Sequence, residues 1–80
     1  MDTAIVETRL TEILREIFNQ PHLQYQPGLT AADVEEWDSL SHVDLIVAVE
    51  TEFAIKLTTG EVRGLKNIGD FVRVIAAKAK

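Results

Sequence analysis

Ser39 is the residue whose position in this chain best suits chemistry. It follows Asp38 at the start of an amphipathic segment that runs to Phe53. Aspartate and serine are both common at helix N-termini, so a helix start alone explains this pair. The same place also suits a phosphate, because free N–H groups and the positive end of the helix dipole favour an anion there. A serine at this helix start can therefore carry a phosphodiester at low electrostatic cost.

The residues around Ser39 do not form a catalytic or metal site. His42 lies three residues on, too close in sequence to complete a triad, and no distant His–Asp pair is evident. It falls toward the core side of the predicted helix, so we interpret it as a partly covered structural histidine. The chain has no cysteine and no loop with the glycine-centred carboxylate spacing of an EF-hand. We therefore expect neither a catalytic residue nor a metal ligand.

The predicted helix over residues 39–53 is apolar on two opposite sides, at about 100° per residue. Only one side can face the thin core of so small a chain, and we assign the side with more apolar area to it. This core side consists of Leu45, Ile46, Val49 and Phe53. The other side is then an exposed apolar strip, which favours a docking face for partner proteins. The docking face consists of Leu40, Val43 and Val47, with the exposed acids Asp44 and Glu50 beside them.

A helix and a long loop precede this segment. Apolar residues at steps of three and four predict a helix over about residues 4–18, capped by Asp2 or Thr3, and Pro21 prevents any continuation of it. Residues 19–37 contain several turn-forming residues and predict an ordered loop, in which Thr30 with Asp33 can cap a short helical turn. The apolar residues expected to pin this loop to the core are Leu23, Tyr25, Leu29, Val34 and Trp37.

Two further helices follow an extended link. Thr58 with Glu61 predicts a capping box for a short helix over about residues 59–64, which Gly64 ends. Asn67 and Asp70 can cap a last helix, whose apolar face consists of Ile68, Phe71, Val72 and Ile75. At its C-terminus, Lys78 and Lys80 complement the helix dipole. The expected fold is all-α, a small four-helix bundle of three main helices and one short helix, with a long loop between the first two.

The length and the net charge of the chain restrict the classes of protein to which it can belong. The chain has 80 residues, enough for one domain over residues 1–80. Its net charge of −5, with no Lys or Arg from Asp33 to Phe53, disfavours nucleic acid and anionic membranes and suits a basic protein partner. No apolar run is long enough to span a bilayer, and no signal peptide opens the chain. We expect a cytoplasmic monomer that does not insert into membranes.

Three stretches together form a recognisable pattern that covers nearly all of the chain, namely "WDSLSHVDLIVAVETEF", "AIKLTTGEV" and "LKNIGDFVRVI". In these stretches the chain resembles an acyl carrier protein, one of the phosphopantetheine-binding carrier domains. The resemblance implies that a phosphopantetheinyl transferase attaches 4′-phosphopantetheine from coenzyme A to Ser39, beside Asp38. The thiol of this arm would then hold acyl groups as thioesters. Acyl-loading, elongating or acyl-transferring enzymes with basic surfaces would bind the docking face, and the protein would not itself be an enzyme.

The resemblance also implies that the core can open to shelter an acyl chain, although an ordinary closed core explains the same residues. The expected lining consists of Ile46, Val49, Phe53, Leu57, Leu65, Ile68 and Phe71.

Five residues depart from the usual pattern of the family. Ser41 and His42 stand where acids or small polar residues are usual. Trp37 stands where a small or aliphatic residue is common, and we interpret it as a loop anchor that covers the core. Arg63 and Lys66 are basic where housekeeping fatty-acid carriers tend to be acidic. We therefore expect a standalone carrier of a specialised lipid, polyketide or related pathway. The alternatives are an aminoacyl or peptidyl carrier and, from a different class, an unmodified helical adaptor.

Overall fold

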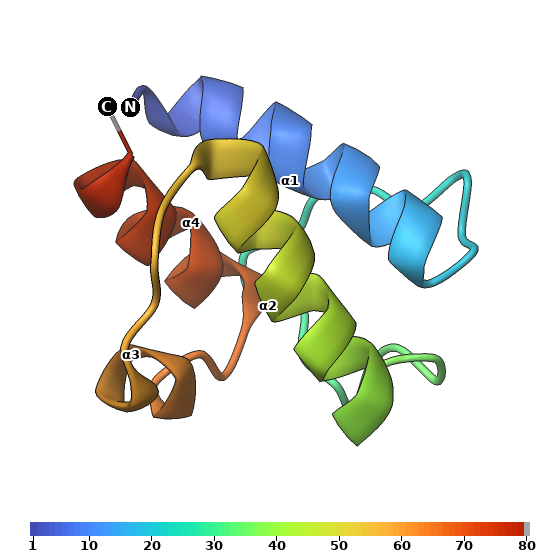
Figure 1. The fold of residues 1–80 in the computed structure, drawn as a ribbon. Coiled ribbons are helices and arrows are strands. Elements are labelled where there is room, and N and C mark those ends of the chain that lie inside the picture. Colours follow the sequence, from blue (N-terminus) through green and yellow to red (C-terminus); the bar gives the residue numbers. More distant parts are fainter. Residues whose placement is uncertain (80) are drawn as a thin grey trace.

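The computed structural model describes residues 1–79 and consists of four helices (Figure 1). Three are longer, α1 (Thr3–Ile17), α2 (Ser39–Phe53) and α4 (Ile68–Lys78), and one is short, α3 (Thr59–Arg63). No strand occurs in the described residues, and the link after α2 is extended, as predicted. The predicted all-α class, helix order and long first loop are confirmed. None of the helices within residues 1–79 is long and apolar enough to cross a membrane.

Each helix begins where a polar side chain accepts a hydrogen bond from a nearby backbone N–H. The four capping residues are Asp2, Asp38, Thr58 and Asn67. In the last three helices the third helical residue returns a bond to the cap, which completes a capping box. These returning residues are Ser41, Glu61 and Asp70. The sequence therefore places the helix starts through caps that satisfy N–H groups with no partner inside the helix.

The helices end by different means. α1 ends at Ile17, within one residue of the predicted end, and Asn19 then adopts a left-handed conformation with a φ of 52° before the chain reaches Pro21. Asparagine tolerates this conformation better than most residues. Ala54 ends α2 with a φ of 53°, although a β-carbon makes that conformation costly. Gly64 ends α3 as predicted, but with an ordinary φ of −84°.

The core lies where α1 packs against both α2 and α4 (Figure 1). α2 contributes its predicted core side, with Leu45, Val49 and Phe53 buried and Ile46 half-buried. The other buried residues come from α1, the link, the segment between α3 and α4, and α4, and they are Val6, Leu10, Leu14, Ile55, Leu65, Ile68, Phe71, Val72 and Ile75. The predicted loop anchors are also confirmed, because Val34 and Trp37 are buried and the other three pack partly buried against the core.

The long loop is tied to the start of α4 by two backbone hydrogen bonds. The N–H of Ile68 donates to Leu29 O at 3.0 Å, and the N–H of Gly69 donates to Pro27 O at 2.8 Å. These N–H groups belong to the first turn of α4 and have no partner within that helix. The loop carbonyls therefore satisfy the helix start, and the helix start fixes the loop.

Two polar groups act differently from their predictions. Asp33 Oδ2 accepts from both the N–H and the hydroxyl of Thr30, so the acid closes a turn and Thr30 caps no helix. Lys78 does not act only on the dipole of α4, since its Nζ lies 2.6 Å from Glu61 Oε1 and ties α4 to α3. Lys80, predicted to act beside it, lies outside the described residues.

The close approach of the loop predicts opposite effects for two glycine substitutions. A β-carbon at Gly69 would lie 3.0 Å from Pro27 O and 3.2 Å from Pro27 Cβ, so Gly69→Ala should lower the free energy of unfolding by about 1–3 kcal/mol. A β-carbon at Gly60 meets nothing closer than 4.0 Å, so Gly60→Ala should be neutral or stabilising by up to about 1 kcal/mol. Denaturant unfolding of both variants measures the difference. Equal midpoints would contradict the tight packing of the loop on α4.

Candidate functional site at the start of α2

Ser39 and Ser41 occupy different environments at the start of α2. Ser39 is the first helical residue and is exposed, and its hydroxyl makes no hydrogen bond within residues 1–79. The Ser41 hydroxyl accepts from the N–H of Asp38 at 2.8 Å and lies 2.8 Å from Glu36 O, to which it donates. Ser41 is thus part of the helix start, whereas the Ser39 oxygen is available to an incoming group.

Asp38 holds this helix start in place and does not activate Ser39. Its Oδ1 accepts from the N–H of Ser41 at 2.9 Å. Hydrogen bonds from the backbone and side chain of Ser41 lower the pKa of Asp38, so it remains ionised at neutral pH. Since this carboxylate is engaged by the backbone, it positions the first turn of α2 and is a poor general base for the neighbouring serine.

His42 is half-buried and pairs with Trp37. The indole Nε1–H donates to His42 Nδ1 at 3.1 Å, and the two rings stack with centroids 6.1 Å apart. Trp37 is 6% exposed and packs against Phe18 and Phe71. His42 is half-buried, which confirms the prediction that it is partly covered. Within residues 1–79 it makes no hydrogen bond to Ser39.

The apolar strip of the docking face is exposed as predicted. Leu40 is 79% exposed, Val43 60% and Val47 55%, at the positions of α2 that face away from α1 and α4. Asp44 is also exposed and lies next to Val43 in the chain. Large aliphatic side chains gathered on one side of a helix with acids at their border form a surface suited to a partner with an apolar centre and basic edges.

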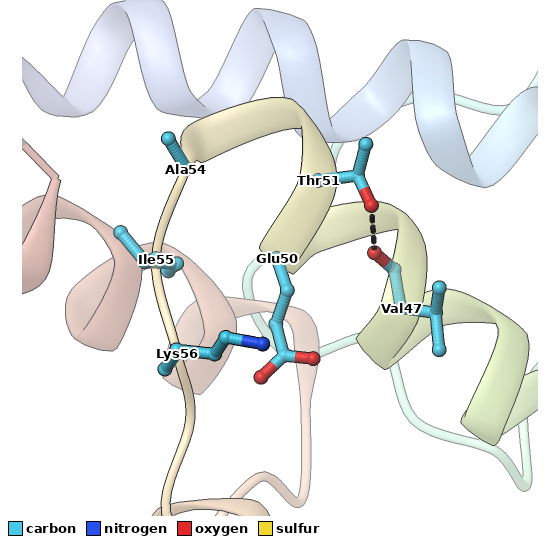
Figure 2. Close-up of a pocket in the computed structure, with 6 residues that line it drawn as sticks. All are labelled: Val47, Glu50, Thr51, Ala54, Ile55 and Lys56. Atoms are coloured by element: carbon cyan, nitrogen blue, oxygen red, sulfur yellow. Dashed lines mark hydrogen bonds between the residues drawn. The ribbon is translucent and has the colours of Figure 1, made fainter.

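Glu50 corrects one expectation about this face, because it is not an exposed acid. It is half-buried, and its Oε2 accepts from the N–H of Leu57 at 2.9 Å. Figure 2 shows its side chain lying between α2 and the extended link, with the Lys56 amine pointing toward its carboxylate. The carboxylate therefore ties the link to α2, a role that only the path of the chain after Ala54 reveals.

The residues expected to line an acyl chain gather in one core. Five are buried and come from α2, α4 and the segment between α3 and α4, namely Val49, Phe53, Leu65, Ile68 and Phe71. Ile46 and Leu57 are half-buried and pack against the same cluster. Their proximity is what sheltering a chain between these elements would require, and sheltering itself remains a prediction.

Sequence reasoning did not assign a role to Ser41. The pattern of a capping aspartate followed three residues later by a hydroxyl side chain could have indicated it, since this is the spacing of a capping box. The pairing of Glu61 with Lys78 across seventeen positions carries no comparable sequence signal.

Comparison with known proteins finds relatives over most of the chain. The chain is 39% identical over 69 residues to the acyl carrier protein of Acidothermus cellulolyticus, a match that covers 86% of this chain and 82% of that protein. This chain belongs to the acyl carrier protein family. Members of the family are carriers rather than enzymes, and they work with acyl-handling enzymes. No family model matches the chain.

A more specialised relative and a solved structure agree with this assignment. The meromycolate extension acyl carrier protein of Mycolicibacterium aurum is 30% identical over 66 residues, which cover 82% of this chain and 68% of that protein. The solution structure of a holo acyl carrier protein from Geobacter metallireducens superposes with a TM-score of 0.84 and 38% identity, covering 89% of this chain and 82% of that one. The family assignment therefore rests on both sequence and fold.

Asp44 and Glu50 should respond differently to the same charge reversal. Asp44→Lys changes an exposed residue, so the free energy of unfolding should move by less than about 0.5 kcal/mol. Glu50→Lys removes the acceptor of the Leu57 N–H and should destabilise the protein by about 1–3 kcal/mol. Because both variants change the net charge equally, urea unfolding isolates the hydrogen bond. If the two variants unfold at the same midpoint, Glu50 does not hold the link.

Proposed function

We propose that Ser39 carries 4′-phosphopantetheine as a phosphodiester and that the protein thereby transports acyl groups between enzymes. The observation that supports this is the Ser39 hydroxyl, exposed and without a hydrogen bond within residues 1–79, at the first residue of α2 in a member of this family. The arm, when attached, supplies a thiol that holds an acyl group as a thioester. The neighbouring Ser41 is a poor alternative, because its hydroxyl is engaged in the helix start.

The surroundings of Ser39 fit a phosphodiester. In the attachment step the Ser39 oxygen would form a bond to the pantetheine-bearing phosphorus of coenzyme A while the pyrophosphate P–O bond to the adenosine part breaks. The serine proton would pass to the transferase, and adenosine 3′,5′-bisphosphate would leave. The exposed serine gives the transferase access, and the helix N-terminus favours the attached phosphate. Asp38 keeps its carboxylate on the N–H of Ser41 and so holds the turn that presents Ser39.

The docking face is proposed to bind the transferase and the enzymes that load or transfer acyl groups. Its exposed aliphatic residues provide contact area, and Asp44 provides the charge that steers a basic surface toward it. Glu50 contributes less to this face than expected, since its carboxylate is occupied by the Leu57 N–H. Ser39 lies at one end of the same helix, so a docked enzyme would hold its own active site near the attachment point.

The charge around α3 is the reason for proposing a specialised pathway. Arg63 and Lys66 are exposed, whereas Glu61, the acid of α3, is paired with Lys78. The hydrogen bond from Lys78 lowers the pKa of Glu61, and the positive charge of Lys78 offsets the negative charge of Glu61 within the molecule. The surface of α3 therefore presents positive charge, which repels the basic docking surface of a housekeeping fatty-acid enzyme.

The two serines provide a matched test of the attachment site. Ser39→Ala should fold normally and gain no mass when incubated with coenzyme A and a broad phosphopantetheinyl transferase. Ser41→Ala should lose about 1 kcal/mol of stability, because the helix start loses two hydrogen bonds, yet it should still gain one arm. Intact-mass spectrometry reads both outcomes. An arm on the Ser39→Ala protein would show that the assignment is wrong.

The basic surface of α3 should limit loading by a housekeeping enzyme. Loading of the modified protein with malonate by a housekeeping malonyl transferase should show a kcat/KM about tenfold below that of the enzyme's own carrier, a difference of about 1.4 kcal/mol. Arg63→Glu with Lys66→Glu should recover part of this loss, and added salt should narrow the gap, because both residues are exposed. Equal kcat/KM for the unmutated protein and the enzyme's own carrier would assign it to the housekeeping role.

A further inference from the structure

A shallow pocket of about 480 Å³ opens beside Ser39. The long loop supplies Ala31 and Trp37 to its lining, and the start of α2 supplies Asp38, Ser39 and His42. The proposed attachment residue thus lines the same depression as the only tryptophan of the chain.

The aromatic part of this lining is fixed from behind by the core. Trp37 lies 5.7 Å from Phe18 and 6.3 Å from Phe71 between ring centroids. His42 stacks on Trp37 at an interplanar angle of 15° and meets the edge of Phe71 at 6.0 Å. Because both rings are held by several neighbours, they offer a ligand a rigid apolar wall at little entropic cost.

His42 adds one hydrogen-bond donor to that wall. An indole N–H can only donate, so the Nδ1 that receives it must be unprotonated, and the neutral imidazole then carries its proton on Nε2. His42 Nε2 has no hydrogen-bond partner within residues 1–79. Every buried side-chain nitrogen in that range does have a partner, so Nε2 is not a buried atom. The Nε2–H is therefore accessible at the surface and available to an acceptor on a ligand.

We propose that this pocket seats the pantoyl part of the arm carried by Ser39, an inference that rests on the proposed function. The pantoyl unit directly follows the phosphate, so its position matches a pocket that includes Ser39. Its paired methyl groups pack against Trp37 and His42, and its hydroxyl or amide oxygen accepts from His42 Nε2–H. Asp38 is the charged residue of the lining, and its negative charge makes the pocket better suited to a neutral group than to an anionic one.

The seat would direct the arm away from the docking face. At about 100° per residue, Ser39 lies between His42 on one side of α2 and the strip of Leu40, Val43 and Val47 on the other. An arm that rests on the His42 side leaves the exposed strip open to an enzyme. Trp37 and His42 are then positioning residues that hold the arm until a docked partner withdraws it.

The experiment compares apo and holo protein by NMR. Isotope-labelled protein carrying an unlabelled arm should show contacts between the arm methyl protons and the ring protons of Trp37 and His42. His42→Ala should lose the contacts to the Trp37 ring, whereas His42→Gln should keep them, because glutamine retains both an acceptor for the indole and a donor. Glu35→Ala, an exposed loop change outside the pocket lining, should leave the contacts unchanged. Backbone spectra verify that each variant is folded, and His42→Gln still tests the seat if His42→Ala unfolds.

Fluorescence gives a second readout, because all tryptophan emission comes from Trp37. Attachment of the arm should reduce quenching by acrylamide relative to the apo protein. Arm contacts confined to the docking face, with unchanged quenching, would overturn the seat while leaving the attachment at Ser39 intact. A wild-type chain that gains no arm by intact mass would overturn both the attachment and the seat, so the two failures are distinguishable.

Discussion

The burial of the Trp37 indole determines where the functional surface lies. The ring packs between Phe18 of the α1 end and Phe71 of α4, so the last residue of the long loop is fixed against the core. The chain must then turn outward, and Asp38 and Ser39 emerge at the surface as α2 begins. The reciprocal hydrogen bonds of Asp38 and Ser41 hold this exit in one conformation. The presentation of Ser39 is therefore a consequence of a hydrophobic contact, not only of helix capping.

The elements of the fold could be predicted because their signals are local. The periodicity of α2 separates Leu45 and Val49 from Leu40 and Val47, and the structure buries the first pair and exposes the second. Caps such as Thr58 and Asn67 mark their helices within three residues of the helix start. The start of α2 is where the caps predict it, and the structure exposes Ser39 there, while the role of Ser39 stays a prediction.

The features that sequence reasoning missed depend on contacts between distant segments. The sequence predicts Glu50 to be a surface acid, because nothing in its own helix indicates that the backbone N–H of Leu57 donates a hydrogen bond to it. The same holds for Glu61 and Lys78, whose pairing follows from the approach of α3 to the end of α4. Charge near a docking surface therefore has to be assessed after intramolecular partners are known.

The bonds from the long loop to α4 couple parts of the chain that α2 and α3 separate in sequence. The N–H groups of Ile68 and Gly69 start α4, yet their acceptors are carbonyls of Leu29 and Pro27. If the loop detaches, the first turn of α4 loses its partners, and if that turn frays, the loop loses its attachment. The two segments thus open as one cooperative unit, and local unfolding of either exposes both. The stretch of chain leading into Trp37 and Ser39 consequently shares the stability of the last helix.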